Sequence, residues 1–292
     1  MKSIKYAIFA YCIMATASTS TLCTTPTITL FSHGIADTWK QARRYTKSYT
    51  RKNGIVVKND RYLINTPYVS FNYPDATTKF YRVNYNETSF GQKNEIDRLY
   101  KGYQHITTKS KNCNVILKGV SRGASNLLIF AGLYQLENVR AMVLESPYHI
   151  MAEVIESKMQ QMNLTWLPLS YGEFVAESIF KKYTRYGHSP ANCIENIAKE
   201  LPILIICSKE DSLVPYTSSL NVYKKLVETG HTHVYIFIAE HGRHAFILQG
   251  PDGEKYQQVV NAFYKKYNLP YSAEDAEKGE SLLALCQPIF IS

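Results

Sequence analysis

The chain has 292 residues, of which 45% are hydrophobic and 20% charged, and its formal net charge is +9. This length and composition fit one large globular domain and exclude a disordered or fibrous chain. The basic residues are scattered, without a zinc-ligand spacing or an RNA-binding signature, so we expect no nucleic-acid partner.

The first 17 residues have the pattern of a secretory signal peptide. Lys2 and Lys5 precede an apolar run at 6–17, which is too short to span a bilayer comfortably. Ala15-Thr16-Ala17 offers a small-x-small cleavage site. We therefore expect an exported protein, periplasmic or secreted, with no membrane span after cleavage; an uncleaved anchor is the alternative.

The cysteines do not form a disulfide framework. Six are present, and one lies in the signal segment, which leaves an odd number. Cys113 and Cys207 fall in apolar runs and are expected to be buried thiols. A bridge among Cys23, Cys193 and Cys286 stays open.

The first half of the mature chain alternates predicted strands and helices. A strand at 27–32 ends in His33-Gly34-Ile35. The next predicted elements are, in order, a helix at 37–49, a strand at 68–72 and a helix at 95–107. This alternation is the signature of a mostly parallel sheet covered by helices on both faces.

A G-x-S-x-G motif at 119–123 lies between an apolar run at 114–118 and a helical run at 125–133. A serine between a strand and a helix is held on a sharp turn that exposes its hydroxyl, and the glycines let both elements pass close by. The helix that follows directs its free N–H groups at the place where an oxyanion would form. Ser121 is therefore the candidate nucleophile.

The second half continues the pattern around a long insertion. A strand at 140–145 precedes residues 148–200, whose apolar residues from Ile150 to Met162 recur at helical spacing. The later predicted elements are a strand at 202–207, a helix at 217–229, a strand at 233–239 and a helix at 254–267. Residues 269–292 are left as a C-terminal tail.

The two later strands each end in polar residues that can complete the chemistry. Asp211 follows the strand at 202–207, with Glu210 as the neighbouring alternative. His244 follows the strand at 233–239, with His241 as its rival. The order Ser, Asp, His along the chain suits a base that activates the serine and an acid that orients the base.

With these motifs in this order, the chain resembles the α/β-hydrolase superfamily over roughly residues 27–268. The resemblance implies a core made of 27–147 and 201–268, a sheet of about six strands, and a helical lid at 148–200. It implies Ser121, Asp211 and His244 as the triad, because the family places its base directly before an apolar helix start. It also implies an oxyanion hole made of the backbone N–H groups of Ile35 and Arg122.

Several alternatives stay open at this stage. Arg122 either meets the substrate or, as the commoner arrangement, turns away to pair with a carboxylate.

The function favoured is hydrolysis of a carboxylic ester or thioester through an acyl-enzyme. No metal or organic cofactor is expected, and the substrate is a small-molecule or peptide acyl compound. A serine exopeptidase or amidase would hold the substrate amine with lid acids (Glu153, Glu156, Glu173, Glu177), and a catalytically silent binding protein is the rival outside the enzymes.

Overall fold

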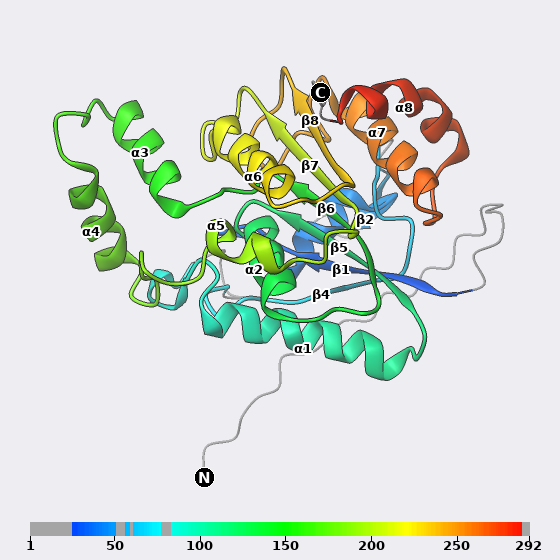
Figure 1. Ribbon diagram of the computed structural model, residues 1–292, viewed down its shortest axis with the longest axis horizontal. Coiled ribbons are helices and arrows are strands. Elements are labelled where there is room, and N and C mark those ends of the chain that lie inside the picture. Colours follow the sequence, from blue (N-terminus) through cyan, green and yellow to red (C-terminus); the bar gives the residue numbers. More distant parts are fainter. Residues whose placement is uncertain (1–24, 51–55, 59–60, 77–82, 288–292) are drawn as a thin grey trace, which may run out of the picture.

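A six-stranded, entirely parallel sheet forms the centre of the protein (Figure 1). The computed structural model describes residues 25–50, 56–58, 61–76 and 83–287; the expected signal segment and Cys23 lie outside them. The strands are, in spatial order, β4 (Tyr68–Ser70), β1 (Thr27–Ser32), β5 (Asn114–Val120), β6 (Val139–Glu145), β7 (Ile203–Ser208) and β8 (Val234–Ala239). The predicted six-stranded α/β architecture is confirmed.

Helices cover both faces because the central strands are apolar on both sides. In β5, Leu117 packs into one core cluster and its neighbour Ile116 into the other. The first cluster is closed by α1 (Lys93–Lys109), α2 (Arg122–Leu133) and α6 (Tyr216–Glu228). The second is closed by the 3-10 helix η1 (Trp39–Tyr45), α7 (Gly253–Lys266) and α8 (Ala273–Leu285). The loops at the strand ends therefore emerge from a sheet whose central strands are buried on both faces.

The helix predicted over 37–49 is shorter than expected. Only the 3-10 helix η1 forms, and the chain then turns into β2 (Ser48–Thr50), which pairs with β3 (Val56–Lys58) in a small antiparallel ladder. The reason is that the carbonyl of Tyr45 accepts hydrogen bonds from the N–H groups of Leu63 and Ile64, both at 2.8 Å. A carbonyl used in this way is not available to continue the helix.

The insertion between β6 and β7 contains two helices that pack on each other, α3 (Met151–Gln161) and α4 (Leu169–Ile179). They stand out from the sheet at one end of the molecule (Figure 1). Their close approach depends on Gly172, where a Cβ would lie 2.5 Å from the sulfur of Met159. The short helices α5 (Pro190–Cys193) and η3 (Ile194–Asn196) then lead the chain back to the core.

The C-terminal region assigned as a tail contains a helix. Helix α8 packs along α7, and Gly279 is the point of closest approach, since a Cβ there would lie 2.1 Å from the carbonyl oxygen of Gln258. Beyond α8, the carbonyl of Cys286 accepts a 2.9 Å hydrogen bond from the N–H of Ile236. The end of the described chain therefore covers part of the outer edge of β8.

The four cysteines of the described residues are buried free thiols. The Cys193–Cys286 bridge left open by the sequence is therefore not formed. Burial raises the pKa of Cys207 to about 12, which keeps this thiol protonated and unreactive.

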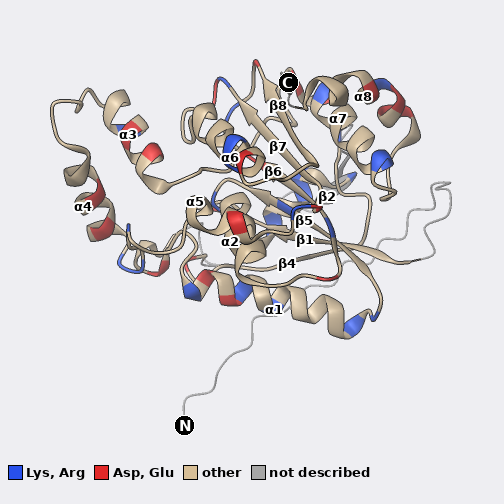
Figure 2. Ribbon diagram, viewed as in Figure 1, with Lys and Arg blue, Asp and Glu red and all other residues tan. Residues whose placement is uncertain are grey.

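Charged residues are spread over the helices rather than gathered in one stripe (Figure 2). Within the part of the chain that the structure describes, no helix is both long and apolar enough to cross a bilayer.

Candidate active site

Ser121 occupies a strained turn between β5 and α2. Its backbone has φ 57° and ψ −127°, a conformation that costs a residue with a side chain on the order of 1–3 kcal/mol. A Cβ on Gly119 would lie 2.7 Å from the backbone of Ala124, and a Cβ on Gly123 would lie 2.2 Å from the carbonyl oxygen of Ser32. Both flanking glycines of the motif are therefore required sterically.

Asp211 and His244 lie in direct contact. The Nδ1 atom of His244 is 2.7 Å from Oδ2 of Asp211. An ionised carboxylate only accepts hydrogen bonds, so Nδ1 of His244 is the donor and its Nε2 atom is left to take up a proton. The Asp211 side chain is fully buried and that of His244 nearly so.

Three further hydrogen bonds hold the Asp211 carboxylate. The N–H groups of Leu213 and Val214 donate to Oδ1, each at 2.9 Å. The hydroxyl of Ser146, at the end of β6, donates to Oδ2 at 2.8 Å. These bonds hold the carboxylate in the position that orients the His244 ring.

The rival pair, Glu210 and His241, lies on the surface. Nδ1 of His241 is 2.9 Å from Oε1 of Glu210, and both side chains are more than half exposed. The hydrogen bond between them raises the pKa of His241 and lowers that of Glu210. Glu210 also accepts a hydrogen bond from the N–H of Gly242, so this pair ties together the two loops that carry Asp211 and His244.

The loop after β1 lies beside Ser121. A Cβ on Gly34 would be 3.4 Å from the Cβ of Ser121. The carbonyl of Gly34 accepts hydrogen bonds from Nδ1 of His33 at 2.7 Å and from Nη2 of Arg122 at 3.3 Å. In a trans peptide the C=O and N–H point in opposite directions. Fixing the Gly34 carbonyl therefore turns the N–H of Ile35 away from these groups.

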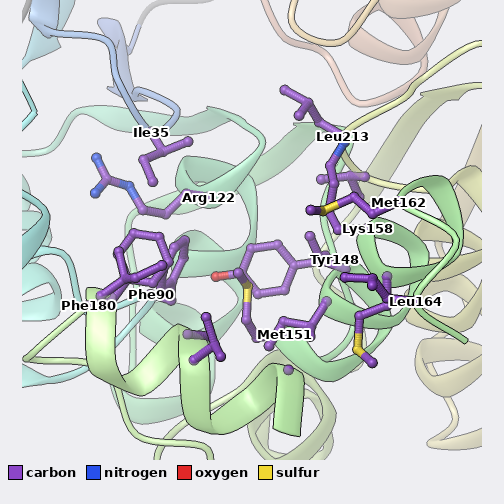
Figure 3. A pocket seen from close by; sticks show the side chains of 18 of the residues that line it. Ile35, Phe90, Arg122, Tyr148, Met151, Lys158, Met162, Leu164, Phe180 and Leu213 are labelled. Atoms are coloured by element: carbon purple, nitrogen blue, oxygen red, sulfur yellow. The ribbon is translucent and has the colours of Figure 1, made fainter. Parts of the chain in front are cut away.

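Arg122 is fully buried, and its guanidinium is held by two carboxylates. Its Nη1 atom is 2.6 Å from Oδ2 of Asp75 and 3.1 Å from Oε1 of Glu95. The ring of Tyr73 also lies against the guanidinium, at 4.5 Å. The side chain points away from the centre of the cavity (Figure 3), so the carboxylate-paired alternative for Arg122 is the one observed.

His33 is buried beside this ion pair as a neutral ring. Nδ1 donates to the Gly34 carbonyl, and Nε2 accepts the N–H of Tyr73 at 3.2 Å. Burial, with a smaller effect of the neighbouring Arg122 charge, lowers the pKa of His33 to about 3. A neutral His33 therefore shapes the loop over a wide pH range.

A second buried polar group lies behind the site, on the other face of the sheet. Glu145 accepts hydrogen bonds from the hydroxyls of Tyr45 and Tyr256, each at 2.9 Å. Burial lowers the pKa of Lys118 to about 8 and raises the pKa of Glu145. The backbone carbonyl of Glu145 accepts the N–H of Ser121 at 2.7 Å, so the end of β6, which carries this side-chain group, also holds the backbone of the strained turn.

Ser121 and His244 line one cavity of about 590 Å³, which extends between α3 and α4 (Figure 3). The backbone positions of the expected oxyanion hole, Ile35 and Arg122, belong to the same lining. The structure thus brings together all five site residues chosen from the sequence. The remaining lining is almost entirely apolar, and most of its residues belong to the insertion (among them Met151, Val154, Ile155, Met159, Met162, Tyr171, Val175, Ala176, Ile179).

The sequence did not predict the side chains that bind Arg122 and Asp211. Asp75 and Glu95 lie far from the motifs along the chain, and no spacing marks them as partners of Arg122. Ser146 had a usable signal, because it directly follows β6 and the carboxyl ends of neighbouring parallel strands meet at one sheet edge. Trp166 does not appear among the cavity residues; three methionines of the insertion, Met151, Met159 and Met162, do.

No cluster of three or more His, Cys, Asp or Glu side chains suited to a metal ion occurs in the described ranges.

The model of the prolyl oligopeptidase family matches residues 93–269, more than half of the chain. The match contains Ser121, Asp211 and His244. The chain is also 27% identical over 184 residues to the uncharacterized protein YqkD of Bacillus subtilis (strain 168). That alignment covers 62% of this chain and 57% of YqkD, so it spans little more than half of that relative.

Solved structures share the fold at low sequence identity. The Pyrococcus furiosus esterase Pf2001 superposes with a TM-score of 0.55 at 17% identity, covering 83% of this chain and 84% of that one. The acylaminoacyl peptidase of Pyrococcus horikoshii gives 0.56 at 18% identity, covering 88% of this chain but 40% of the peptidase. MGS-M2, an α/β hydrolase from a Medee basin deep-sea metagenome library, gives 0.51 at 15% identity, covering 87% and 94%. These likenesses confirm the α/β-hydrolase fold.

Proposed function

The chain belongs to the prolyl oligopeptidase family, and from this we propose that it is a serine hydrolase that cleaves a carboxylic ester or thioester through an acyl-enzyme on Ser121. The observation that carries the proposal is the contact of 2.7 Å between His244 and a buried Asp211, at the cavity that also contains Ser121. An aspartate that orients a histidine beside a serine is the arrangement that activates a hydroxyl nucleophile.

In the proposed mechanism, Nε2 of His244 removes the proton of the Ser121 hydroxyl as its oxygen attacks the acyl carbon. The carbonyl oxygen of the substrate becomes an oxyanion, which the N–H groups of Ile35 and Arg122 stabilise. The first N–H groups of a helix have no partner within the helix, and that of Arg122 begins α2. The protonated His244 then donates its proton to the leaving alcohol or thiol. In the second half, His244 removes a proton from water as the water attacks the acyl carbon, and it returns that proton to Ser121 as the acid is released.

An ester substrate is favoured over a peptide with a free N-terminal amine because three of the four candidate lid acids already bind other side chains. Glu153 accepts hydrogen bonds from Ser218 and Asn221. Glu173 and Glu177 both pair with Arg185, and Glu173 lines a separate cavity of about 150 Å³. None of the glutamates of the insertion is part of the lining of the large cavity, which therefore offers little to hold a charged amine.

The test has two steps. Wild-type protein and Ser121→Ala are treated with a fluorophosphonate probe; we expect labelling of the wild type only, since the probe needs an activated serine. A panel of acyl esters is then compared with aminoacyl amides. Labelling equal in both proteins would refute the role of Ser121, absence of labelling in both would favour a silent binding protein, and faster turnover of the amides would favour an exopeptidase.

We also propose that the protein is exported and that residues 1–17 are removed as a signal peptide. The support is the basic start, the short apolar run and the Ala15-Thr16-Ala17 site. N-terminal sequencing of the native protein outside the cytoplasm should find a start near Ser18. Recovery of the intact N-terminus in a membrane fraction would instead support an anchor.

A further inference from the structure

The cavity between α3 and α4 extends well beyond the catalytic residues. Its walls are the facing sides of the two helices, with Met159 and Ile155 from α3 and Ala176 from α4. The two cations among its lining residues are engaged elsewhere: Arg122 by Asp75 and Glu95, and Lys158 by the carbonyl of Ser212 at 2.5 Å. An acyl group bound there therefore meets hydrocarbon and thioether surface, including flexible methionines that adapt to a chain.

The edge of this cavity is exposed to solvent. We define the apolar rim as the side chains that both line the cavity and are exposed (Met162, Tyr171, Val175, Ile179, Leu213). Two further side chains extend the apolar surface without lining the cavity: Trp166, which is 76% exposed, and Phe174, which is 61% exposed. Exposed apolar residues gathered in this way mark an interaction surface, whereas single ones are ordinary.

Building on the proposed ester hydrolysis, we propose that the substrate is a long-chain lipid ester, whose acyl chain lies between α3 and α4 and which the protein takes from a lipid surface with its apolar rim. Two observations carry this: a cavity of about 590 Å³ with an apolar wall, and its continuity with the exposed rim. Long-chain esters are held in water as aggregates, because their apolar surface avoids solvent. An enzyme that accepts them must place the mouth of its cavity against such a surface.

The charge around the rim favours a neutral lipid surface. Residues 148–186 carry four acidic residues and four basic ones (Glu153, Glu156, Glu173, Glu177; Lys158, Lys181, Lys182, Arg185). This balance contrasts with the net charge of +9 of the whole chain. Attachment would therefore come from insertion of Trp166 and Phe174 among the lipids, an aromatic anchoring that salt does not screen.

The acyl chain is tested with a series of esters of one alcohol and increasing acyl length. Burying each further methylene contributes about 0.8 kcal/mol, so kcat/KM of the wild type should rise about fourfold per methylene until the cavity is filled. Ala176→Phe places a ring between α3 and α4, obstructs the path of the acyl chain and should flatten this series. Val175→Phe at the rim is a second obstruction that disturbs the packing less. Ala152→Phe, on α3 but outside this cavity, is the matched control and should keep the wild-type slope.

Surface binding is tested by sedimentation with phosphatidylcholine vesicles at low and high salt. Wild-type protein should sediment at both, Trp166→Gln and Phe174→Gln should remain in the supernatant, and the control Leu285→Gln should sediment like the wild type. Leu285 is 83% exposed on α8, a helix that lies away from α3 and α4 (Figure 1). Sedimentation abolished by salt, or a rim that instead holds two copies together in solution with no vesicle binding, would overturn the proposal.

An esterase without an acyl-chain site can be distinguished from a protein with no esterase activity. A protein that is labelled at Ser121 and cleaves acetate esters as fast as long-chain esters remains a serine esterase but has no acyl-chain site. A protein that is neither labelled nor active on any ester refutes both. Thermal melting of each variant shows whether the fold is retained.

Discussion

At the scale of single residues, the two histidines of the loop after β8 have different surroundings. Replacing each of them is therefore expected to affect activity differently. His244→Ala removes the proposed base, so kcat should fall on the order of a millionfold and probe labelling should be lost. His241→Ala should lower activity only modestly, because its contact with Glu210 stabilises the loop from the surface. Steady-state kinetics and probe labelling of both variants provide the measurement. Similar losses in the two variants would contradict the assignment.

Arg122 is predicted to act as a positioning residue through its side chain. Arg122→Lys keeps one positive charge beside Asp75 and Glu95 but cannot reproduce the fork that also reaches the Gly34 carbonyl. A less fixed Ile35 N–H weakens oxyanion stabilisation, and removing one oxyanion-hole donor outright costs about 100- to 1,000-fold in kcat. We therefore expect kcat for a short ester to fall by about tenfold or more while KM stays nearly constant. A raised KM at unchanged kcat would show that Arg122 binds substrate instead.

Residue by residue, the sequence predicts the parts of the site that follow strand ends and misses those that come from elsewhere. Ser121, Asp211 and His244 each follow a strand of the same parallel sheet, so their proximity is implied by topology. Asp75 and Glu95 approach Arg122 from a loop and from the first turns of α1. Their position depends on tertiary packing, and neither periodicity nor spacing carries that information.

At the scale of elements, the bounds of a strand can be predicted where its sequence is an apolar run. The bounds of a helix cannot be predicted where a single tertiary contact determines its end. Strands β5 to β7, and β8 at the edge of the sheet, are largely apolar and are found within one or two residues. The 3-10 helix η1 ends early because the carbonyl of Tyr45 is taken by a distant segment. Helix α8 has a short amphipathic pattern, and its packing on α7 becomes visible only in three dimensions.

The contact between α7 and α8 gives a testable prediction about stability. Gly279→Ala places a Cβ against the backbone of Gln258, which cannot rotate away. Overpacking of this kind costs about 1–3 kcal/mol, more than the helix propensity gained by replacing glycine. Urea unfolding should show a lower midpoint for this variant. Ser281→Ala, on the exposed side of α8, is the control and should leave the midpoint unchanged; an equal midpoint for Gly279→Ala would contradict the close packing.

At the scale of the whole molecule, every group of the proposed site is presented at the carboxyl edge of one sheet. The loops after β1, β5, β7 and β8 carry the proposed oxyanion loop, nucleophile, acid and base, and the loop after β6 leads into α3 and α4. The sheet is packed between two buried cores, while the insertion supplies the wall that we propose meets the substrate. Changes in the insertion can therefore alter the substrate without altering the catalytic geometry.

The burial of His33, in the loop beside Ser121, makes the free energy of unfolding of the whole protein depend on pH. Burial holds the pKa of His33 near 3, below its value of 6.5 in a model peptide. Between these two values the unfolded chain binds a proton that the folded chain does not, so stability decreases as the pH falls from about 6.5 to about 3. Each pH unit in this window costs about 1.4 kcal/mol.

His33→Asn tests this dependence, because asparagine can still donate to the Gly34 carbonyl but does not titrate. We expect the variant to be less stable than the wild type at neutral pH and to lose less stability on acidification from pH 6 to pH 4. Urea unfolding at a series of pH values measures both. His188→Asn, at an exposed position, should keep the wild-type slope. If His33→Asn also kept that slope, His33 would be protonated in the fold, and the neutral ring that binds both Gly34 and Tyr73 would be excluded.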